Sequence, residues 1–467
     1  RNGIKMPSEC VANPLQRSLA DAIIRMLPLD EIRILLACGA KVNEPVTQGL
    51  RPLHYAVWQR HKAAVQLLLV RGADVNARDE CGYSAMHLSA EHGYTELVHL
   101  LLQYGSKVDF RDDTDEPFPK TTICDEPLRL AIRNKHMDIA RVLLEHGADP
   151  NKRYFFGSEI NLVNDPESLD LLLTFGAYTE ARDRAGMTPL MRAARQIQGM
   201  ECVLLLLSYG ADYNAMTDAR NDFRTVLHYA VLSGNSAVVN LLLKQGVKID
   251  AMPPAPELDR PSPLELAILR GDPALVRILL EAGASVRRSS PIIGSPLHVA
   301  CADNIPHRME ILKMLLSYGA DPNMRVYGED GESTLRSPLA ELLASNENPK
   351  QEEILLLLRY GARVVMRSPF RDPDGILNCL FNVKATIPLF HILCEVSESF
   401  DLSMIKRSNQ LDSLQKAELL DRGTKTTTLK SQARRFFRRR LGRRLSEIDF
   451  STEIPETLHE YLLCQRM

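Results

Sequence analysis

Apolar residues along most of this chain fall on pairs of short helical stripes, separated by polar turns that contain glycine. The first stripe of a pair begins at a Ser/Thr-Pro-Leu step such as Thr188-Pro189-Leu190, and the second carries a leucine run such as Leu204 to Leu207. Ser or Thr can accept hydrogen bonds from the free N–H groups of a first helical turn, and proline there loses no bond. Glycine can then end the second helix in a left-handed conformation. The pattern predicts an all-α chain of helix-turn-helix units.

A glycine phrase marks the end of each unit. Copies of Gly-Ala-Asp-x-Asn begin at Gly72, Gly147, Gly210 and Gly319, close variants with Lys in the third position begin at Gly39 and Gly105, and weaker copies begin at Gly176, Gly246, Gly283 and Gly361. A spacing near 33 residues is typical of ankyrin repeats. Over about residues 18–400 the chain therefore resembles the ankyrin-repeat family, which implies a solenoid of about ten repeats with hairpin loops. One helix pair cannot bury its apolar faces alone, so the repeats are expected to share one core.

The resemblance also assigns roles to residues of the first helix in each repeat. The histidine after the Pro-Leu step tethers loop backbone in that family, and His54, His87, His228 and His298 match it. Other positions face a concave groove that binds a target protein. By position these are Tyr55, Trp58, Gln59, Leu88, Glu91, His92, Leu130, Arg133, Asn134, Arg192, Arg195 and Tyr229. Aromatic and arginine side chains are common interface anchors, although packing between adjacent helices would explain the same residues.

Three departures from the repeat pattern are candidates for specificity. An acidic, proline-containing insertion lies near residues 110–126, and Met252 to Pro256 lengthens another connection. In the unit ending at Gly176, the first helix is shortened to about Ile160 to Val163, after the aromatic sequence Tyr154-Phe155-Phe156. Insertions in repeat arrays often lie on the binding face, but simple loop tolerance remains an alternative.

Composition and charge narrow the possible functions. The chain has 467 residues, 45% of them apolar, and a formal net charge of -2, so its overall charge favours neither nucleic acid nor a membrane as partner. It shows no secretory signal and no apolar run of roughly 18 residues, which predicts a protein of the cytoplasm or nucleus. The sequence starts at Arg1, which leaves open whether residues precede it.

The nine cysteines form no C-x-x-C pair, which argues against a zinc site and a disulfide framework. We expect Cys81, Cys202 and Cys301, which lie inside repeats, to be buried thiols. Phosphate-binding, dinucleotide, zinc-protease and nucleophile-elbow motifs are all missing from the sequence. We therefore expect a non-catalytic protein with no cofactor, no metal and no small-molecule substrate.

The repeat period stops after residue 400. The predicted organisation is an N-terminal segment (1–17), a repeat array (18–400), a linker with a short helix near 408–420 (401–427) and a C-terminal module (428–467). In the module, residues 428–442 predict an amphipathic helix. Its apolar stripe consists of Leu429, Ala433, Phe436, Phe437 and Leu441, and its other face is rich in arginine. Residues 423–467 carry ten Lys/Arg and five Asp/Glu, a local charge of +5.

This module resembles a SOCS box. In that family the first helix begins with a small residue and leucine and inserts the leucine into Elongin C, while a later Leu-Pro-φ-Pro element faces a cullin. The resemblance implies Elongin-binding residues Leu429, Ala433, Phe436 and Phe437, and cullin-binding residues Ile454, Pro455 and Leu458. Ala433 replaces the usual cysteine, and Thr452-Glu453 stands where Leu-Pro would be, so the resemblance does not specify which cullin is bound.

Together the two resemblances imply a substrate-recognition adaptor of a ubiquitin ligase. Its partners would be Elongin B and Elongin C, a cullin with its RING protein, and a target protein that the sequence does not identify. Two alternatives stay open. The basic amphipathic helix has the features of a segment that binds calmodulin, an anionic membrane or RNA, and the tail is also suited to capping the last repeat.

Overall fold

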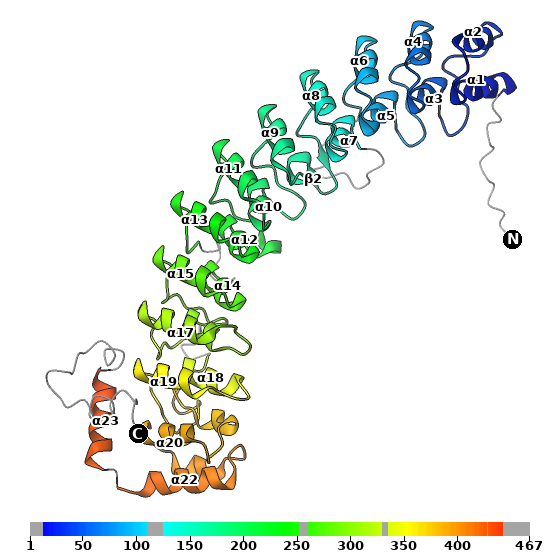
Figure 1. The fold of residues 1–467 in the computed structure, drawn as a ribbon. Helices are drawn as coiled ribbons and strands as arrows, with labels where there is room; N and C mark the ends of the chain where they lie inside the picture. The colour runs from blue at the N-terminus through cyan, green and yellow to red at the C-terminus, as the bar shows by residue number, and fades with distance from the viewer. Residues whose placement is uncertain (1–12, 111–124, 252–259, 329–334, 427, 442–467) are drawn as a thin grey trace, which may run out of the picture. The chain divides into compact units, whose positions relative to one another are not determined.

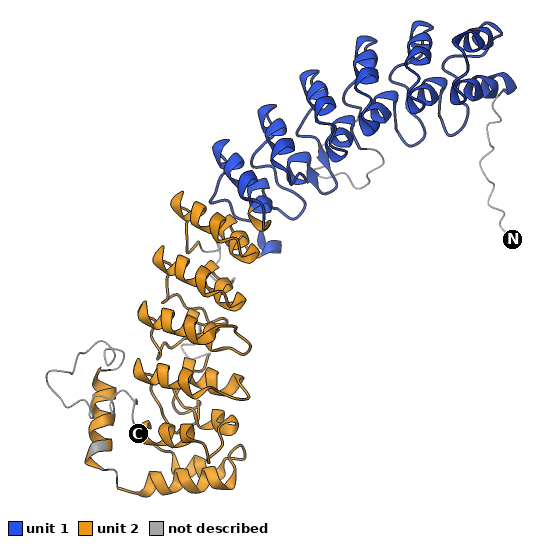
Figure 2. Ribbon diagram, in the orientation of Figure 1, with its two compact units in different colours: residues 1–193, 198–221 blue, residues 194–197, 222–467 orange. Residues whose placement is uncertain are grey.

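The computed structural model of the chain describes residues 13–110, 125–251, 260–328, 335–426 and 428–441. The chain divides into two compact units (Figure 2). Unit 1 comprises residues 1–193 and 198–221, and unit 2 comprises residues 194–197 and 222–467. Helices make up nearly all of the regular structure in the described residues of both units (Figure 1).

Unit 1 consists mainly of consecutive helix pairs. Its helices are α1 (Pro14–Ile24), α2 (Leu29–Ala37), α3 (Pro52–Trp58), α4 (Lys62–Val70), α5 (Ala85–His92), α6 (Thr95–Gln103), α7 (Pro127–Arg133), α8 (Met137–Glu145), α9 (Pro166–Thr174), α10 (Pro189–Arg195) and α11 (Met200–Ser208). The last residues of α10 are assigned to unit 2. A short 3-10 helix, η2 (Ala219–Asn221), follows α11.

Unit 2 continues the pattern and then departs from it. Its paired helices are α12 (Val226–Ser233), α13 (Ser236–Lys244), α14 (Pro263–Arg270), α15 (Pro273–Glu281), α16 (Pro296–Cys301), α17 (Arg308–Ser317), α18 (Pro338–Ser345) and α19 (Gln351–Arg359). After them come η3 (Leu377–Asn382), α20 (Pro388–Val396), α21 (Leu402–Arg407), α22 (Ser413–Thr424) and α23 (Leu429–Leu441).

The apolar stripes read from the sequence form the cores of both units. In α5 the side chains of Met86 and Ala90 are fully buried, and in its partner α6 Leu97 and Leu101 are buried. Helix α5 packs against α3, α6 and α7, so the first helices of successive repeats lie side by side. In unit 2, α14 is packed in the same way between α12 and α16. Each helix pair therefore buries its apolar faces against the neighbouring pairs and depends on them for stability.

Asparagines at the end of the glycine phrase link one repeat to the next. Asn43 donates from Nδ2 to the Gly72 carbonyl (2.9 Å) and accepts at Oδ1 from the Asp74 N–H (2.7 Å). Asn323 does the same with the Gly361 carbonyl (2.9 Å) and the Arg363 N–H (2.8 Å). Each side chain thus pairs two backbone groups of the following turn, which gives the phrase a structural reason that its spacing alone did not reveal.

The repeat that ends at Gly176 differs from its neighbours. In place of a first helix it has a two-stranded hairpin, β1 (Arg153–Tyr154) and β2 (Gly157–Ser158), followed by the 3-10 helix η1 (Glu159–Asn161). The predicted shortening is confirmed, but the helix expected at about Ile160 to Val163 is only this single 3-10 turn. The aromatic sequence Tyr154 to Phe156 belongs to the hairpin.

The tail of unit 2 packs on the end of the repeats. Gln415 of α22 is buried and donates from Nε2 to the carbonyls of Leu380 (2.9 Å) and Val383 (2.7 Å). The short helix expected near 408–420 corresponds to α22, which begins and ends a few residues later. Helix α23 occupies most of the predicted amphipathic segment and packs against α20.

Several sequence predictions fall outside the described residues. They are most of the insertion near 110–126, the Met252 to Pro256 segment, and the cullin-binding candidates Ile454, Pro455 and Leu458. Of the three cysteines expected to be buried, Cys202 and Cys301 are, whereas Cys81 is exposed because it lies in a hairpin turn ahead of α5. In the described part of the chain, no helix combines the length and apolar character needed to cross a bilayer.

Candidate functional site

The four histidines at equivalent positions of the repeats hold loop backbone. Nδ1 of His54 accepts from the Arg51 N–H (3.1 Å), and its Nε2 lies 3.2 Å from the Tyr83 carbonyl, to which it donates. His298 does the same between the Ser295 N–H and the Arg336 carbonyl, both at 3.1 Å. The rings of His54 and His298 therefore link their own helix starts to the following loop, as the resemblance implied, and His87 accepts at its own helix start from the Ser84 N–H (3.1 Å).

This arrangement needs neutral imidazole rings. Burial lowers the pKa of His87 to about 3 and the pKa of both His228 and His298 to about 4. Burial also lowers the pKa of His54. A protonated Nδ1 could not accept a backbone N–H, so the hydrogen bonds favour the neutral form as well. These residues serve the scaffold, and their geometry offers no acid–base pair for catalysis.

An aromatic cluster lies at the C-terminal ends of α3 and α5 in unit 1. The Trp58 ring, 58% exposed, meets the His92 ring edge-on with centroids 5.1 Å apart. His92 stacks on Tyr94 (5.6 Å), and the Arg60 guanidinium lies 5.5 Å from the Tyr94 ring centroid. These contacts hold Trp58 and His92 in place while leaving both rings accessible, as an interface anchor requires.

Charged residues continue this surface along α5 and α7. Arg133 forms an ion pair with Asp125 (3.0 Å) and lies 3.8 Å from Glu91. Arg192 of α10 binds the buried Asp183 at 2.5 Å. Tyr55 and Gln59 are half-buried at the same helix surface, and Tyr55 shares a hydrogen bond with Thr47. Six of the predicted target-binding residues of unit 1 thus lie together on α3, α5 and α7 or next to them, and Arg192 lies further along the unit.

Two predicted target-binding residues are placed wrongly. Leu88 and Tyr229 are buried, with exposures of 7% and 4%, because their positions on α5 and α12 face the neighbouring helices. Packing, the alternative explanation, therefore applies to them and also to Leu130 of α7. In unit 2, Arg195 is exposed at the end of α10.

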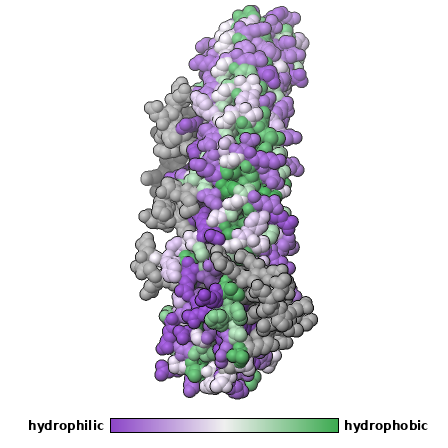
Figure 3. All heavy atoms as spheres, turned by 90° about the vertical axis from the view of Figure 1, so that its left-hand side faces the viewer, coloured by the Kyte–Doolittle hydropathy of each residue, from purple (hydrophilic) through white to green (hydrophobic). Residues whose placement is uncertain are grey.

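Helix α23 presents the reverse of the usual burial pattern. Arg434 is completely buried and donates to Glu395 of α20 (3.2 Å), and Arg438 is buried and donates to the Ala362 carbonyl (2.9 Å). The apolar stripe faces outward, with Leu429 83% and Phe436 61% exposed. The Phe436 and Phe437 rings pack edge to face with centroids 5.8 Å apart. Figure 3 looks onto this side of unit 2, where strongly hydrophilic and hydrophobic side chains lie close together.

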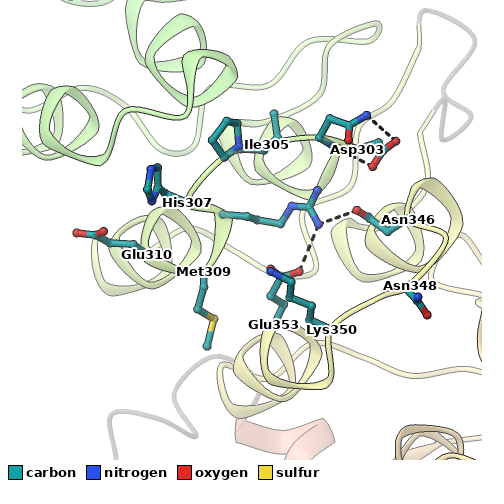
Figure 4. Close-up of a pocket in the computed structure, with 12 residues that line it drawn as sticks. Asp303, Ile305, His307, Met309, Glu310, Asn346, Asn348, Lys350 and Glu353 are labelled. Atoms are coloured by element: carbon teal, nitrogen blue, oxygen red, sulfur yellow. Dashed lines mark hydrogen bonds and ion pairs between the residues drawn. The ribbon is translucent and has the colours of Figure 1, made fainter.

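A pocket of about 500 Å³ lies in unit 2 between the turns that precede α17 and α19 (Figure 4). Arg308 crosses it and donates to Asn346 Oδ1 (2.6 Å), Glu353 Oε2 (3.3 Å) and the Ala302 carbonyl (2.7 Å). These bonds tie the two turns together. Since the central guanidinium is held by the protein itself, we attribute to this pocket a structural role. Among the described residues no group of His, Cys, Asp and Glu is arranged to hold a metal ion.

Sequence profiles of ankyrin repeats match much of the chain. A profile described as ankyrin repeats (3 copies) matches residues 64–154 and 160–253, one described as ankyrin repeats (many copies) matches 35–89, and a single ankyrin repeat matches 295–326. The chain is an ankyrin-repeat protein. Ankyrin repeats indicate a protein–protein interaction domain, consistent with the exposed anchors on α3 and α5.

Similarity to curated relatives is confined to part of this ankyrin-repeat protein. Human palmitoyltransferase ZDHHC13 is 32% identical over 128 residues, which cover 27% of this chain and 20% of the relative. Protein glp-1 of Caenorhabditis elegans is 34% identical over 145 residues, covering 27% of this chain and 11% of that protein. The crystal structure of the human ASB11 ankyrin repeat domain is 23% identical, with a TM-score of 0.39, and covers 52% of this chain and 100% of that one.

Proposed function

We propose that this ankyrin-repeat protein is the target-recognition adaptor of a ubiquitin ligase built on Elongin B, Elongin C, a cullin and a RING protein. The repeats would bind the target protein, and the module that starts at Thr428 would recruit the ligase. The adaptor performs no chemistry. It brings a lysine of the target close to the charged ubiquitin-conjugating enzyme and so raises the effective concentration of the reacting groups.

The orientation of α23 is the observation that best supports recruitment. A helix that only caps the repeats would bury its apolar stripe against them, because that burial stabilises the fold. Here the arginine face packs on α20 and the stripe with Leu429 and Phe436 remains accessible. The resemblance to a SOCS box assigns the same stripe to Elongin C. An accessible apolar face on an otherwise docked helix is suited to a protein partner.

The surface around Trp58 and His92 supports target binding by the repeats. Its aromatic rings are accessible and held in fixed contacts, which reduces the entropy lost on binding. Glu91, the residue before His92, and Arg133, 3.8 Å from Glu91, provide both signs of charge. Such a centre of aromatic residues with a polar rim resembles the energetic core of many protein interfaces.

A second candidate function rests on the charge of the tail. Arg439 and Arg440 are exposed near the exposed Phe436 and Phe437, a combination that suits calmodulin, an anionic membrane or RNA. In this arrangement Arg434 and Arg438 would contribute little, because Arg434 is buried against Glu395 of α20 and Arg438 against the Ala362 carbonyl in the turn after α19. The helix thus offers an anionic partner fewer arginines than its sequence suggests.

Co-expression with Elongin B and Elongin C, followed by size-exclusion chromatography, tests the proposal. The full chain should co-elute with both Elongins, and Leu429→Glu should abolish co-elution because it places a charge on the inserting leucine. Leu414→Glu is the matched control, since Leu414 is an exposed leucine of α22 outside the stripe. A soluble, monodisperse full chain that never co-elutes would contradict the proposal and direct attention to anionic partners.

A further inference from the structure

The β1–β2 hairpin presents two phenylalanines where the other repeats have a first helix. Arg153 pairs with Ser158 and Tyr154 with Gly157, so Phe155 and Phe156 form the two-residue tip. The Phe156 side chain is 56% exposed and Phe155 is half-buried. In Figure 1 this hairpin lies in unit 1 among the first helices of the repeats, near α7.

Turn formation does not account for these two residues. Two-residue hairpin loops favour Gly, Asn and Asp, which readily adopt positive φ. Neither Phe155 nor Phe156 has positive φ, and the left-handed residue is instead Gly157 at φ +135°. The Phe156 side chain, which is 56% exposed, also buries little apolar surface in the free protein. The folding of the hairpin therefore gives no reason for an exposed phenylalanine at its tip.

The base of the hairpin is held firmly. Tyr154 is buried, and the Arg129 guanidinium lies 4.2 Å from its ring centroid. A Cβ at position 157 would lie 3.0 Å from the Asp183 Cβ and 3.1 Å from the Asn161 Oδ1, so only glycine fits without displacement. Asn161 Oδ1 accepts from the Ser158 N–H (3.1 Å). These contacts fix the direction of the tip.

The tip itself is ordered by its own contacts. The Phe155 and Phe156 rings meet edge to face with centroids 4.8 Å apart, and the Arg184 guanidinium lies 4.2 Å from the Phe155 centroid. The Arg184 N–H donates to the Phe156 carbonyl (3.4 Å). A stacked guanidinium keeps its N–H edge available for a carboxylate. The exposed Phe156 ring and the Arg184 guanidinium, both packed on Phe155, are therefore ordered before any partner binds.

Charge around the tip is predominantly positive. Lys152, Arg153, Arg182 and Arg184 lie in the hairpin and in the adjacent loop. Arg182 donates to the carbonyls of Gly186 and Met216, which are neutral acceptors. Of the two acids in this loop, Asp183 is buried and binds Arg192, and Glu180 accepts from the Asp212 N–H (2.8 Å). A partner of opposite charge is therefore favoured.

We propose that the tip formed by Phe155, Phe156 and Arg184, the aromatic finger, anchors an acidic segment of the target protein that carries an apolar side chain next to Asp or Glu. The apolar side chain packs on the Phe156 ring and the carboxylate pairs with Arg184. Both contacts use groups that are already ordered, so little conformational entropy is lost on binding. The inference rests on the target-binding half of the proposed function and is independent of ligase recruitment.

A phage-displayed library of random 12-residue peptides, selected on the purified full chain, tests this inference. Selected sequences should place Asp or Glu beside an aromatic or aliphatic residue. A synthetic peptide of the enriched sequence is then titrated by calorimetry. Phe156→Ala and Arg184→Glu should each weaken its binding by about tenfold or more, the effect expected for an interface anchor.

Phe370→Ala is the matched control, because Phe370 of unit 2 is a 96% exposed phenylalanine outside the finger. It should change the affinity by less than about twofold. Three results would overturn the inference. The selected peptides could lack the acidic and apolar pattern, or they could bind the Phe156→Ala chain as tightly as the unchanged chain. The library could also yield no peptide that is enriched on the unchanged chain relative to the Phe156→Ala chain. Elongin co-elution is measured on the same variants and should be unaffected, so failure of the finger and failure of ligase recruitment are distinguishable.

Discussion

Helices α5 and α23 bury opposite kinds of side chain. In α5 the apolar side chains and the neutral His87 are buried, while His92 is exposed. In α23 two arginines are buried, and Leu429 and Phe436 lie outside. An amphipathic pattern therefore identifies the two faces of a helix without saying which face the rest of the chain covers. Where the apolar face stays outside, a binding role is the simplest physical explanation.

The two helices also differ in what their buried polar groups require. His87 is neutral and accepts from the Ser84 N–H at 3.1 Å, so its burial costs little. Arg434 carries its charge into a fully buried position and depends on Glu395. Removing one partner of a buried pair is costly, even where the pair itself adds little to stability. The repeats should therefore be sensitive to protonation, and the tail helix to loss of a single ionic contact.

The largest expected effect is a loss of stability of the repeats when the pH is lowered. His87, His228 and His298 have folded pKa values of about 3 to 4, below the ordinary value of 6.5. Between these values the unfolded chain binds more protons, so stability is fully present above pH 6.5 and is lost as the pH falls towards 4. Urea unfolding should show a loss of several kcal/mol between pH 7 and pH 5. An unchanged midpoint would contradict the neutral-histidine tethers.

Within α5, the buried His87 and the exposed His92 should contribute very differently to stability. His87→Ala should destabilise unit 1 by about 3 kcal/mol, because it leaves a cavity and an unpaired Ser84 N–H. His92→Ala, at the exposed end of the same helix, should change stability by less than about 0.5 kcal/mol. Urea denaturation of the full chain followed by circular dichroism measures both. Equal losses would mean that His92 supports the fold and is not a free surface residue.

Much of the repeat region could be predicted because each unit has the same helix start, the same buried leucines and the same terminal glycine. The Pro-Leu-His step, the leucine run and the glycine recur at similar intervals, so weak signals reinforce one another. The roles of His54 and His298 followed from position within the unit. By contrast, the asparagine contacts, such as Asn43 with Gly72, join neighbouring repeats, and a pattern read within one unit does not show what lies opposite.

On α23, arginine and phenylalanine substitutions should have opposite consequences. Arg434→Ala should release α23 from α20, at a cost of about 2 kcal/mol, since it removes a fully buried side chain together with its ion pair to Glu395. Amide hydrogen exchange of residues 429–441 should accelerate accordingly. Phe436→Ala should leave this exchange unchanged but weaken Elongin binding, if the proposed function holds. Faster exchange in the phenylalanine variant would show that the apolar face, and not the arginine face, holds the helix.

The candidate site was less predictable than the fold. The resemblance to ankyrin repeats placed Leu88 and Tyr229 on the groove-facing side, but neighbouring helices cover them, because burial depends on side-chain packing across repeats. The sequence revealed the two faces of α23 but not the choice between them, which depends on Glu395 and Ala362 far away in the chain. The hairpin was missed because Tyr154 to Phe156 contain no turn residue, and only the following Gly157 gives a signal.

The smallest expected effect concerns Glu159, directly after the hairpin, and has the opposite sign to that of the histidines. Burial raises the pKa of Glu159 to about 7, and its nearest basic atom, Arg129 Nε, is 3.8 Å away. Between pH 4.5 and 7 the folded chain keeps a proton that the unfolded chain releases, so this carboxyl group becomes less favourable to folding as the pH rises.

Glu159→Gln removes the charge but preserves the shape of the side chain. It should stabilise unit 1 by about 1 kcal/mol at pH 8 and by almost nothing below pH 5, where the native carboxyl group is already neutral. Glu91→Gln is the control, since Glu91 is a half-buried acid of α5 beside Arg133. Urea unfolding at both pH values measures the difference. A Glu159→Gln chain that is less stable at pH 8 would show that attraction to Arg129 outweighs burial, so that the base of the aromatic finger depends on an ion pair.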